Sequence, residues 1–217
     1  MVGVVIPLVI AATMTAVMLR QQDPRRLRMP WVTLAIFALT LGVGAFAVFD
    51  DALLDAIRRD GGKLASGEWW RLVTPLVGQD SGLSGLIFNL VLLAVLGAIV
   101  ENVLGRALLL ITYLAAGLLS EIAAYTVMQG QGFAGNSVAT FGLAGLLCVA
   151  GVATSSPARF TGLFGLVFGI VLLAIWDLHA VGFFVGVIIG LVRWLRQWMR
   201  GRPARSAGKV APVSAGP

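Results

Sequence analysis

Two polar residues in the apolar part of this chain are suited to a nucleophilic reaction. Ser137 stands at the start of one apolar run, after a polar, glycine-rich stretch at Gln129–Gly132, and His179, the only histidine, stands at the start of another. A serine hydroxyl becomes a nucleophile when an imidazole accepts its proton, and the imidazole then returns that proton to the leaving amine. The pair therefore indicates acyl transfer by a serine hydrolase.

A third residue, Asn89, is suited to supporting that reaction. Its amide and the backbone N–H groups at the start of the Ser137 segment are donors for the oxyanion that forms when a serine attacks a carbonyl. The same three residues also fit a structural interpretation, in which Ser137 caps a helix, His179 binds at headgroup level and Asn89 joins two helices. The residues alone leave both interpretations open.

The elements that position these residues must lie in a membrane. Of the 217 residues, 59% are hydrophobic and only 12% are charged, whereas a soluble protein carries about a quarter charged residues. This composition excludes soluble enzymes, and nucleic acid is not expected as a partner because the basic residues behind the net charge of +6 stand between apolar runs and at the C-terminus. Cys148 is the only cysteine and stands in an apolar run, so we expect no intramolecular disulfide and no cysteine-based metal site. Nucleophilic catalysis by a serine implies no metal and no organic cofactor either.

Apolar runs long enough to cross about 30 Å of hydrocarbon occur seven times. We therefore expect an all-α membrane protein with spans at Val2–Leu19, Trp31–Phe49, Leu83–Val100, Ala107–Met128, Val138–Ala153, Phe160–Trp176 and Leu178–Val192. The first run lacks the basic start of a signal peptide, contains Pro7 and is followed by arginines, so it is expected to be a retained helix. Glycines at four-residue spacing in the last two runs predict close helix packing, at Gly165, Gly169, Gly182, Gly186 and Gly190.

The arginines and lysines predict the orientation of these spans, because cytoplasmic segments collect basic residues. With the N-terminus outside and the C-terminus in the cytoplasm, the inside segments hold twelve of the 16 basic residues, and the outside segments hold seven acidic ones. We therefore expect a multi-pass protein of the cell membrane in that orientation. Residues 201–217 are rich in Gly, Pro, Ala and Ser and predict a disordered cytoplasmic tail.

Several motifs surround the candidate site residues. In chain order they are Gly67-Glu68-Trp69-Trp70-Arg71-Leu72-Val73-Thr74-Pro75, Phe88-Asn89, Leu96-Gly97, Val100-Glu101, Gly105-Arg106, Gly135-Asn136-Ser137-Val138-Ala139-Thr140-Phe141-Gly142-Leu143 and His179-x-x-Gly182-x-x-x-Gly186. Together they resemble the rhomboid family of intramembrane serine proteases, in the family's order and over Trp31 to about Arg196.

The resemblance implies a rhomboid-like six-helix transmembrane bundle over residues 30–200, with residues 50–82 as an outer loop. Residues 1–29 then form one extra N-terminal transmembrane helix and a basic cytoplasmic loop. The resemblance also implies that Ser137 and His179 form a catalytic dyad supported by Asn89 and Gly135, with Phe141 one turn below the serine and packed against the imidazole. The implied partners are the lipid bilayer and transmembrane protein substrates, which are cleaved in transmembrane or juxtamembrane segments.

The sequence departs from the family's pattern at two positions. Val138 follows the serine where the family usually has glycine, and a β-branched side chain there is expected to crowd the substrate or alter the backbone N–H groups. Gly85 stands where the family commonly has a histidine four residues before the asparagine, which removes one oxyanion donor. A catalytically impaired or inactive rhomboid-like pseudoprotease that binds transmembrane helices is therefore the alternative. A small transporter fits less well because the chain has no internal repeat.

Two further features need a role in this scheme. Glu121 lies within an apolar run, where a carboxylate must face the bundle interior; we weigh a contact close to the active site against an interhelical hydrogen bond. Trp69 and Trp70 are expected to anchor the outer loop at the interface, and Arg71 to bind backbone carbonyls or lipid phosphate.

Overall fold

The computed structural model describes residues 2–23, 27–128, 135–154 and 157–201. In these residues the chain is helical and carries one isolated bridge between Gln79 and Gly135, which confirms the predicted all-α class. Each of the seven predicted spans coincides with one helix: α1 (Val2–Gln21), α2 (Trp31–Ala47), α5 (Gly82–Ile99), α6 (Arg106–Thr126), α7 (Ser137–Val152), α8 (Ala158–Ala174) and α9 (Leu178–Gly201). The predictions for the Gln129–Gly132 stretch and for the tail after Gly201 lie outside the described residues.

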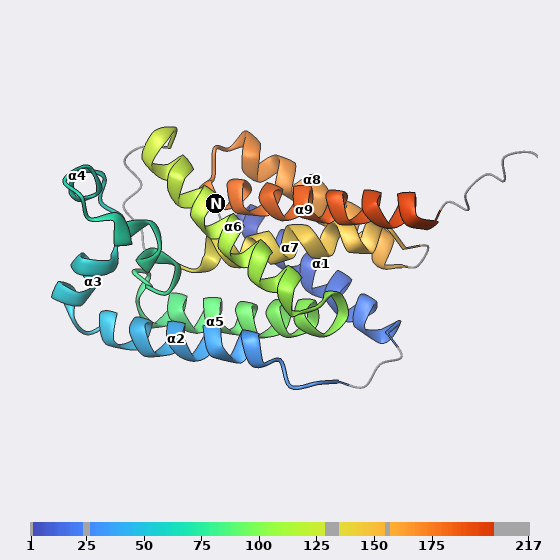
Figure 1. The fold of residues 1–217 in the computed structure, drawn as a ribbon, viewed down its shortest axis with the longest axis horizontal. Helices are drawn as coiled ribbons and strands as arrows, with labels where there is room; N and C mark the ends of the chain where they lie inside the picture. Colours follow the sequence, from blue (N-terminus) through green and yellow to red (C-terminus); the bar gives the residue numbers. More distant parts are fainter. Residues whose placement is uncertain (1, 24–26, 129–134, 155–156, 202–217) are drawn as a thin grey trace, which may run out of the picture.

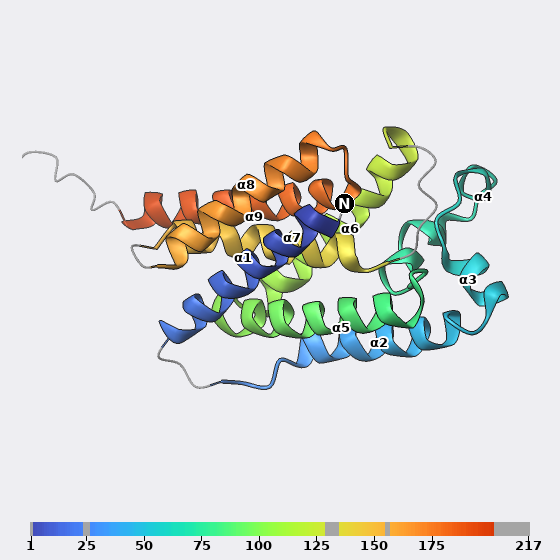
Figure 2. The same ribbon diagram turned by 180° about the vertical axis from the view of Figure 1, so that it is seen from behind.

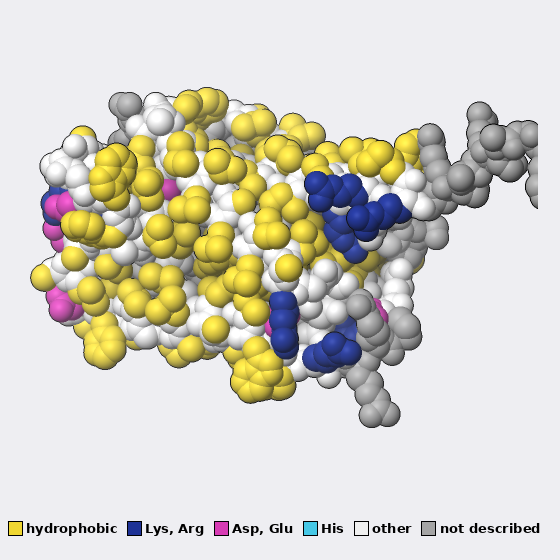
Figure 3. Space-filling view, in the orientation of Figure 1, with side chains coloured by type: hydrophobic (Ala, Val, Ile, Leu, Met, Phe, Trp, Pro, Cys, Tyr) yellow, Lys and Arg dark blue, Asp and Glu magenta, His cyan; other side chains and the backbone are white. Residues whose placement is uncertain are grey.

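The helices are suited to a bilayer by length and composition. Four of them are long and apolar enough to cross a membrane, namely α1, α6, α9 and α5 with the π turn η3 (Val100–Leu104) that follows it. The helices α2, α7 and α8 are apolar and shorter. On the face drawn in Figure 3, apolar side chains cover the middle of the molecule, acidic side chains gather at the end near α3, and basic side chains gather toward the end of α9.

The centre of the bundle is α7. This helix carries no charged residue, and 13 of its 16 residues are buried, as expected for a helix that is apolar on every side. It packs against α9, α8 and α6, and α1 lies across it between α8 and α5 (Figures 1 and 2). A hydrogen bond of 2.7 Å between the hydroxyls of Thr15 and Thr161 links α1 to α8. The extra N-terminal helix is therefore part of the packed bundle.

Small residues allow α7 and α9 to approach until their backbones touch. A Cβ atom added to Gly186 would collide with the backbone carbonyl of Gly142, and one added to Gly182 would collide with the carbonyl oxygen of Val138. In the opposite direction, a Cβ on Gly145 would meet the carbonyl oxygen of Phe183. The glycine spacing of α9 therefore serves the close packing that the sequence predicted.

We expect Gly186→Ala to lower the free energy of unfolding by about 1–3 kcal/mol. The added methyl group would meet backbone on the facing helix, which no rotamer change relieves. Thermal unfolding in detergent measures the effect. Gly42→Ala is the matched control because a Cβ at Gly42 has no atom within 4 Å. Equal unfolding temperatures for the two variants would contradict this account of the α7–α9 contact.

The connection between α2 and α5, predicted as a loop, holds four short helices. These are α3 (Asp51–Ile57), α4 (Gly61–Ala65) and the 3₁₀ turns η1 (Trp69–Leu72) and η2 (Thr74–Leu76). Asp50 and Asp60 start α3 and α4 by accepting backbone N–H groups of the first turn. The hydrogen bond from the Lys63 amide also holds the pKa of Asp60 below its ordinary value. The connection is therefore a folded unit at one end of the bundle (Figure 1).

Two arginines hold this connection in place. Arg71 is buried and donates from Nη1 to the carbonyl oxygens of Asp55 at 2.6 Å and Arg58 at 2.9 Å, which matches the first of its two expected roles. Arg59 forms a bidentate ion pair with Glu121 of α6 at 2.5 and 2.6 Å, and both side chains are buried. Glu121 therefore contacts neither the active site nor another membrane helix through this pair; it anchors the connection to the bundle.

A second buried carboxylate, Glu101, follows α5 and links it to the starts of α2 and α6. Glu101 accepts hydrogen bonds from the backbone N–H groups of Val32 and Thr33 at the start of α2, and from the Thr33 hydroxyl. It also accepts one from Nε of Arg106 at the start of α6. The Val100-Glu101 and Gly105-Arg106 motifs thus fix α2 and α6 relative to α5.

Candidate active site

The structure brings Ser137 and His179 together at one end of the bundle. Ser137 is the first residue of α7, and His179 is the second residue of α9. Because Gly182 lets the first turns of the two helices touch, Nε2 of His179 lies 3.0 Å from Oγ of Ser137. This is the separation at which a base removes a hydroxyl proton.

Asp177 is the third member of this hydrogen-bonded group and was not among the residues predicted from the sequence. It stands just before α9, where its Oδ1 accepts the backbone N–H of His179 at 2.9 Å and lies 2.7 Å from Nδ1 of the ring. Burial acts to raise the pKa of Asp177, but the hydrogen bond and charge of His179 outweigh burial and the pKa lies below its ordinary value. The side chain is therefore a carboxylate at neutral pH and can only accept hydrogen bonds.

This acceptor determines which nitrogen of His179 carries hydrogen. With Nδ1–H donated to Asp177, Nε2 of the neutral ring presents its lone pair to the hydroxyl of Ser137. Phe141, one turn along α7 from the serine, lies against the ring, with centroids 4.6 Å apart and planes inclined by 50°. The imidazole is thus held by Asp177, Ser137 and Phe141 in the orientation of a general base.

Asn89 and Gly135 are both joined to Gln79, and Gly135 stands two residues before Ser137. Asn89 is buried on α5, and its Nδ2 donates to Oε1 of Gln79 at 2.8 Å. The backbone N–H of Gly135 donates to the carbonyl oxygen of Pro75 at 2.9 Å, so Gly135 ties the start of α7 to the α2–α5 connection instead of offering its own N–H to a substrate. Gln79, which pairs with Gly135 in the isolated bridge, is a second neighbour that was not predicted from the sequence.

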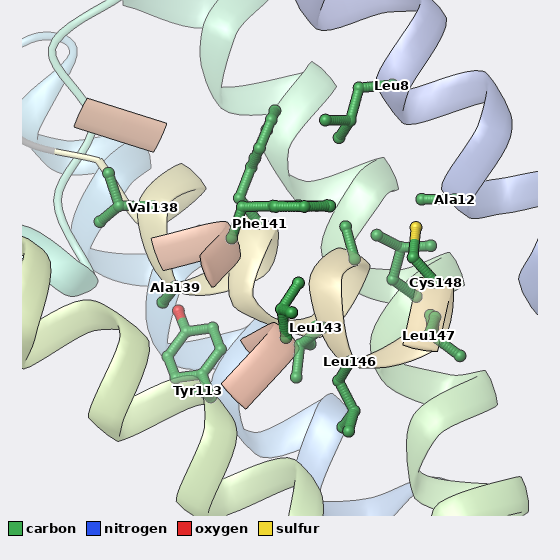
Figure 4. Close-up of a cluster of buried hydrophobic side chains, with 14 of the residues drawn as sticks. Leu8, Ala12, Tyr113, Val138, Ala139, Phe141, Leu143, Leu146, Leu147 and Cys148 are labelled. Carbon is green, nitrogen blue, oxygen red and sulfur yellow. The ribbon is translucent and has the colours of Figure 1, made fainter. Parts of the chain in front are cut away.

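The two departures from the family pattern have distinct settings. Val138 is only 4% exposed and belongs to the buried core cluster that also contains Phe141 (Figure 4). Gly85 has no room for a side chain, because a Cβ there would collide with Cβ of Ser81 and lie 2.9 Å from Nε2 of Gln79. Val138 is therefore part of the core, and neighbouring side chains already fill the space in which a Cβ at Gly85 would lie.

The sequence signals for the two missed residues differ. Asp177 stands two residues before the only histidine and directly before an apolar run, a position where aspartate commonly caps a helix. That spacing was sufficient to suggest a contact with the ring. Gln79 offers no such signal, because a tertiary fold brings it to Asn89 and Gly135.

Comparisons with a family model and with curated proteins point to one and the same family. A sequence model described as the rhomboid domain matches residues 66–196, which is more than half of the chain. The sequence is 43% identical to rhomboid protease GluP of Bacillus subtilis (strain 168) over 84 residues, which are 39% of this chain. It is 36% identical to the putative rhomboid protease YdcA of the same organism over 84 residues, which are 38% of this chain. These matches span 16% and 42% of the relatives' own lengths. On the extent of the domain match, together with its helical membrane bundle, the chain belongs to the rhomboid family.

Proposed function

We propose that the protein is an intramembrane serine endopeptidase that cleaves transmembrane or juxtamembrane segments of other membrane proteins. The observation that carries the proposal is the hydrogen-bonded sequence from Ser137 through His179 to Asp177. Membership of the rhomboid family supports it, and the two relatives are named as proteases.

The proposed reaction follows from the geometry of this group. Oγ of Ser137 attacks the carbonyl carbon of the scissile peptide bond while Nε2 of His179 takes the hydroxyl proton. The carbon–nitrogen bond then breaks as His179 gives that proton to the leaving amine, which leaves an acyl-serine. Water then attacks the acyl-serine while His179 takes one of its protons. The bond between the acyl carbon and Oγ breaks as His179 returns that proton to Oγ, which releases the new carboxylic acid and restores Ser137.

In this scheme Asp177 is a positioning residue. It holds the proton on Nδ1, which keeps Nε2 free to accept, and its negative charge stabilises the imidazolium that forms during each step. Asn89 is suited to donating to the oxyanion through the N–H of its amide that Gln79 does not occupy. The proposed site thus draws on α5, α7 and α9 together.

The location of the group indicates the kind of substrate. Ser137 and His179 lie at the first turns of α7 and α9, near the end of the bundle that carries the α2–α5 connection (Figure 1). A peptide bond inside a helix is shielded by the backbone hydrogen bonds of that helix, so a substrate must unwind before it reaches Ser137. We expect preferred substrates to have Gly, Ala or Ser near the end of the helix that meets this site.

We also propose the orientation with the N-terminus outside and the C-terminus in the cytoplasm. The basic side chains gathered near the end of α9 (Figure 3) would then face the cytoplasm, and the active site would lie toward the outer surface. The polar headgroup region there would supply the water that the second half of the reaction consumes.

Labelling with a serine-directed fluorophosphonate tests the function without a known substrate. The purified native protein is expected to be labelled, and Ser137→Ala and His179→Ala are expected to lose the label. An active rhomboid protease labelled in parallel provides the positive control, and thermal unfolding shows that each variant is folded. Absence of labelling in folded native protein would reject the protease and favour the pseudoprotease that binds transmembrane helices.

A further inference from the structure

The side-chain amide of Gln79 occupies a buried position beside the candidate nucleophile. Gln79 is 2% exposed, which is unusual for a long polar side chain. Its backbone pairs with Gly135, two residues before Ser137, and its amide meets Asn89 of α5. The residue therefore joins three separate parts of the proposed site.

The hydrogen bond from Asn89 fixes the orientation of this amide. Because Nδ2 of Asn89 donates to Oε1 of Gln79 at 2.8 Å, the opposite side of the amide is the N–H₂ group. Within the part of the chain that the structure describes, no acceptor pairs with Nε2 of Gln79. This nitrogen is not among the fully buried side-chain atoms that lack a partner, so it is accessible to a hydrogen-bond acceptor from outside the protein.

The position of the amide relates it to both Gly85 and Ser137. A Cβ on Gly85 would lie 2.9 Å from Nε2 of Gln79, so the amide stands where a side chain at position 85 would enter the site. A Cβ on Gly135 would lie 3.5 Å from Oε1 of Gln79 and equally 3.5 Å from Oγ of Ser137, so the oxygen of the amide and the serine hydroxyl flank the same point, and Nε2 lies on the side of Gly85. The absence of a side chain at Gly85 thus leaves the space that the amide of Gln79 occupies.

We propose that Gln79 is a catalytic residue whose Nε2–H group donates a hydrogen bond to the oxyanion, in place of a side chain at position 85. The inference rests on the proposed function and assigns a donor from the α2–α5 connection to the same site. Gln79 neither gains nor loses a proton. Its N–H and the second N–H of Asn89 stabilise the negative charge on the former carbonyl oxygen while the acyl transfer proceeds as described above.

Gln79→Met and Gln79→Glu test this assignment. Methionine has a similar length and no N–H donor, whereas glutamate keeps an oxygen for Asn89 and replaces the donor with an acceptor. For both variants we expect kcat for a transmembrane substrate to fall by about 10²- to 10³-fold with KM unchanged. The rate constant of fluorophosphonate labelling is expected to fall as well, because the phosphoryl oxygen occupies the position of the oxyanion.

Gln197→Met is the control, since Gln197 is exposed on α9 far along the helix from the site. Unfolding temperatures close to the native value for at least one of the two variants separate catalysis from folding. Native values of kcat in folded Gln79→Met would overturn the assignment while leaving the proposed protease intact, as would a loss that appears in KM alone. Native protein that neither cleaves nor labels would overturn the protease first, and the role of Gln79 with it.

Discussion

Ser137→Ala and His179→Ala are each expected to reduce cleavage of a transmembrane substrate by about 10⁴-fold or more, and the double variant is expected to lose no further activity. In the proposed mechanism, Ser137 and His179 act as one unit across the 3.0 Å contact between Oγ and Nε2, so removing either side chain would remove the whole pathway. Initial rates on a reconstituted substrate in liposomes measure the effect.

A serine outside the site provides the control for this experiment. Ser84 is exposed on α5, and Ser84→Ala is expected to retain native rates. Losses in the double variant equal to the product of the two single losses would mean that Ser137 and His179 act independently. That result would reject the acyl-transfer mechanism even if both single variants were impaired.

Asp177→Asn is expected to lower kcat by about 10²- to 10⁴-fold without changing stability by more than about 0.5 kcal/mol. Asparagine caps a helix as well as aspartate does, so α9 should start as before. It carries no charge to stabilise the imidazolium, and its amide can present an N–H to Nδ1 and so favour the wrong tautomer. Cleavage rates and thermal unfolding, measured on the same samples, separate the two roles.

A spectroscopic measurement makes the role of Asp177 specific. The chain has a single histidine, so the proton on Nδ1 gives one imidazole signal in a nitrogen-15 labelled sample. We expect a strongly downfield proton resonance in the native protein and its loss in Asp177→Asn. Asp50→Asn, which changes the cap of α3, should leave both the resonance and the rate unchanged. Native activity in Asp177→Asn would mean that the carboxylate serves only as a cap.

The membrane helices were predictable because their signal is local. Each apolar run had the length of a span, and each became one helix. The span predicted at Leu178–Val192 is shorter than its helix, because arginines interrupt the apolar run after Val192; helix α9 continues to Gly201. The α3 and α4 helices were missed because they are short and depend on the caps Asp50 and Asp60 more than on an apolar face.

The candidate site was predictable in part for a similar reason. Ser137, His179 and Asn89 stood out because polar groups are rare and costly in apolar runs. The partners of these residues, Asp177 and Gln79, lie at the edges of such runs, where polar residues are common and carry little signal. The contact between Gln79 and Gly135 also joins segments far apart in the chain, which no spacing rule describes.

The buried pair of Arg59 and Glu121 has a consequence for how the protein is made. Glu121 alone would meet hydrocarbon as α6 leaves the translocon, at a cost of about 3 kcal/mol. Arg59 precedes it by 62 residues, so the ribosome delivers the cation before the carboxylate that needs it. Because of this order of synthesis, the α2–α5 connection already exists when α6 enters the membrane. Glu121 can then pair with Arg59 and need not remain unpaired in lipid.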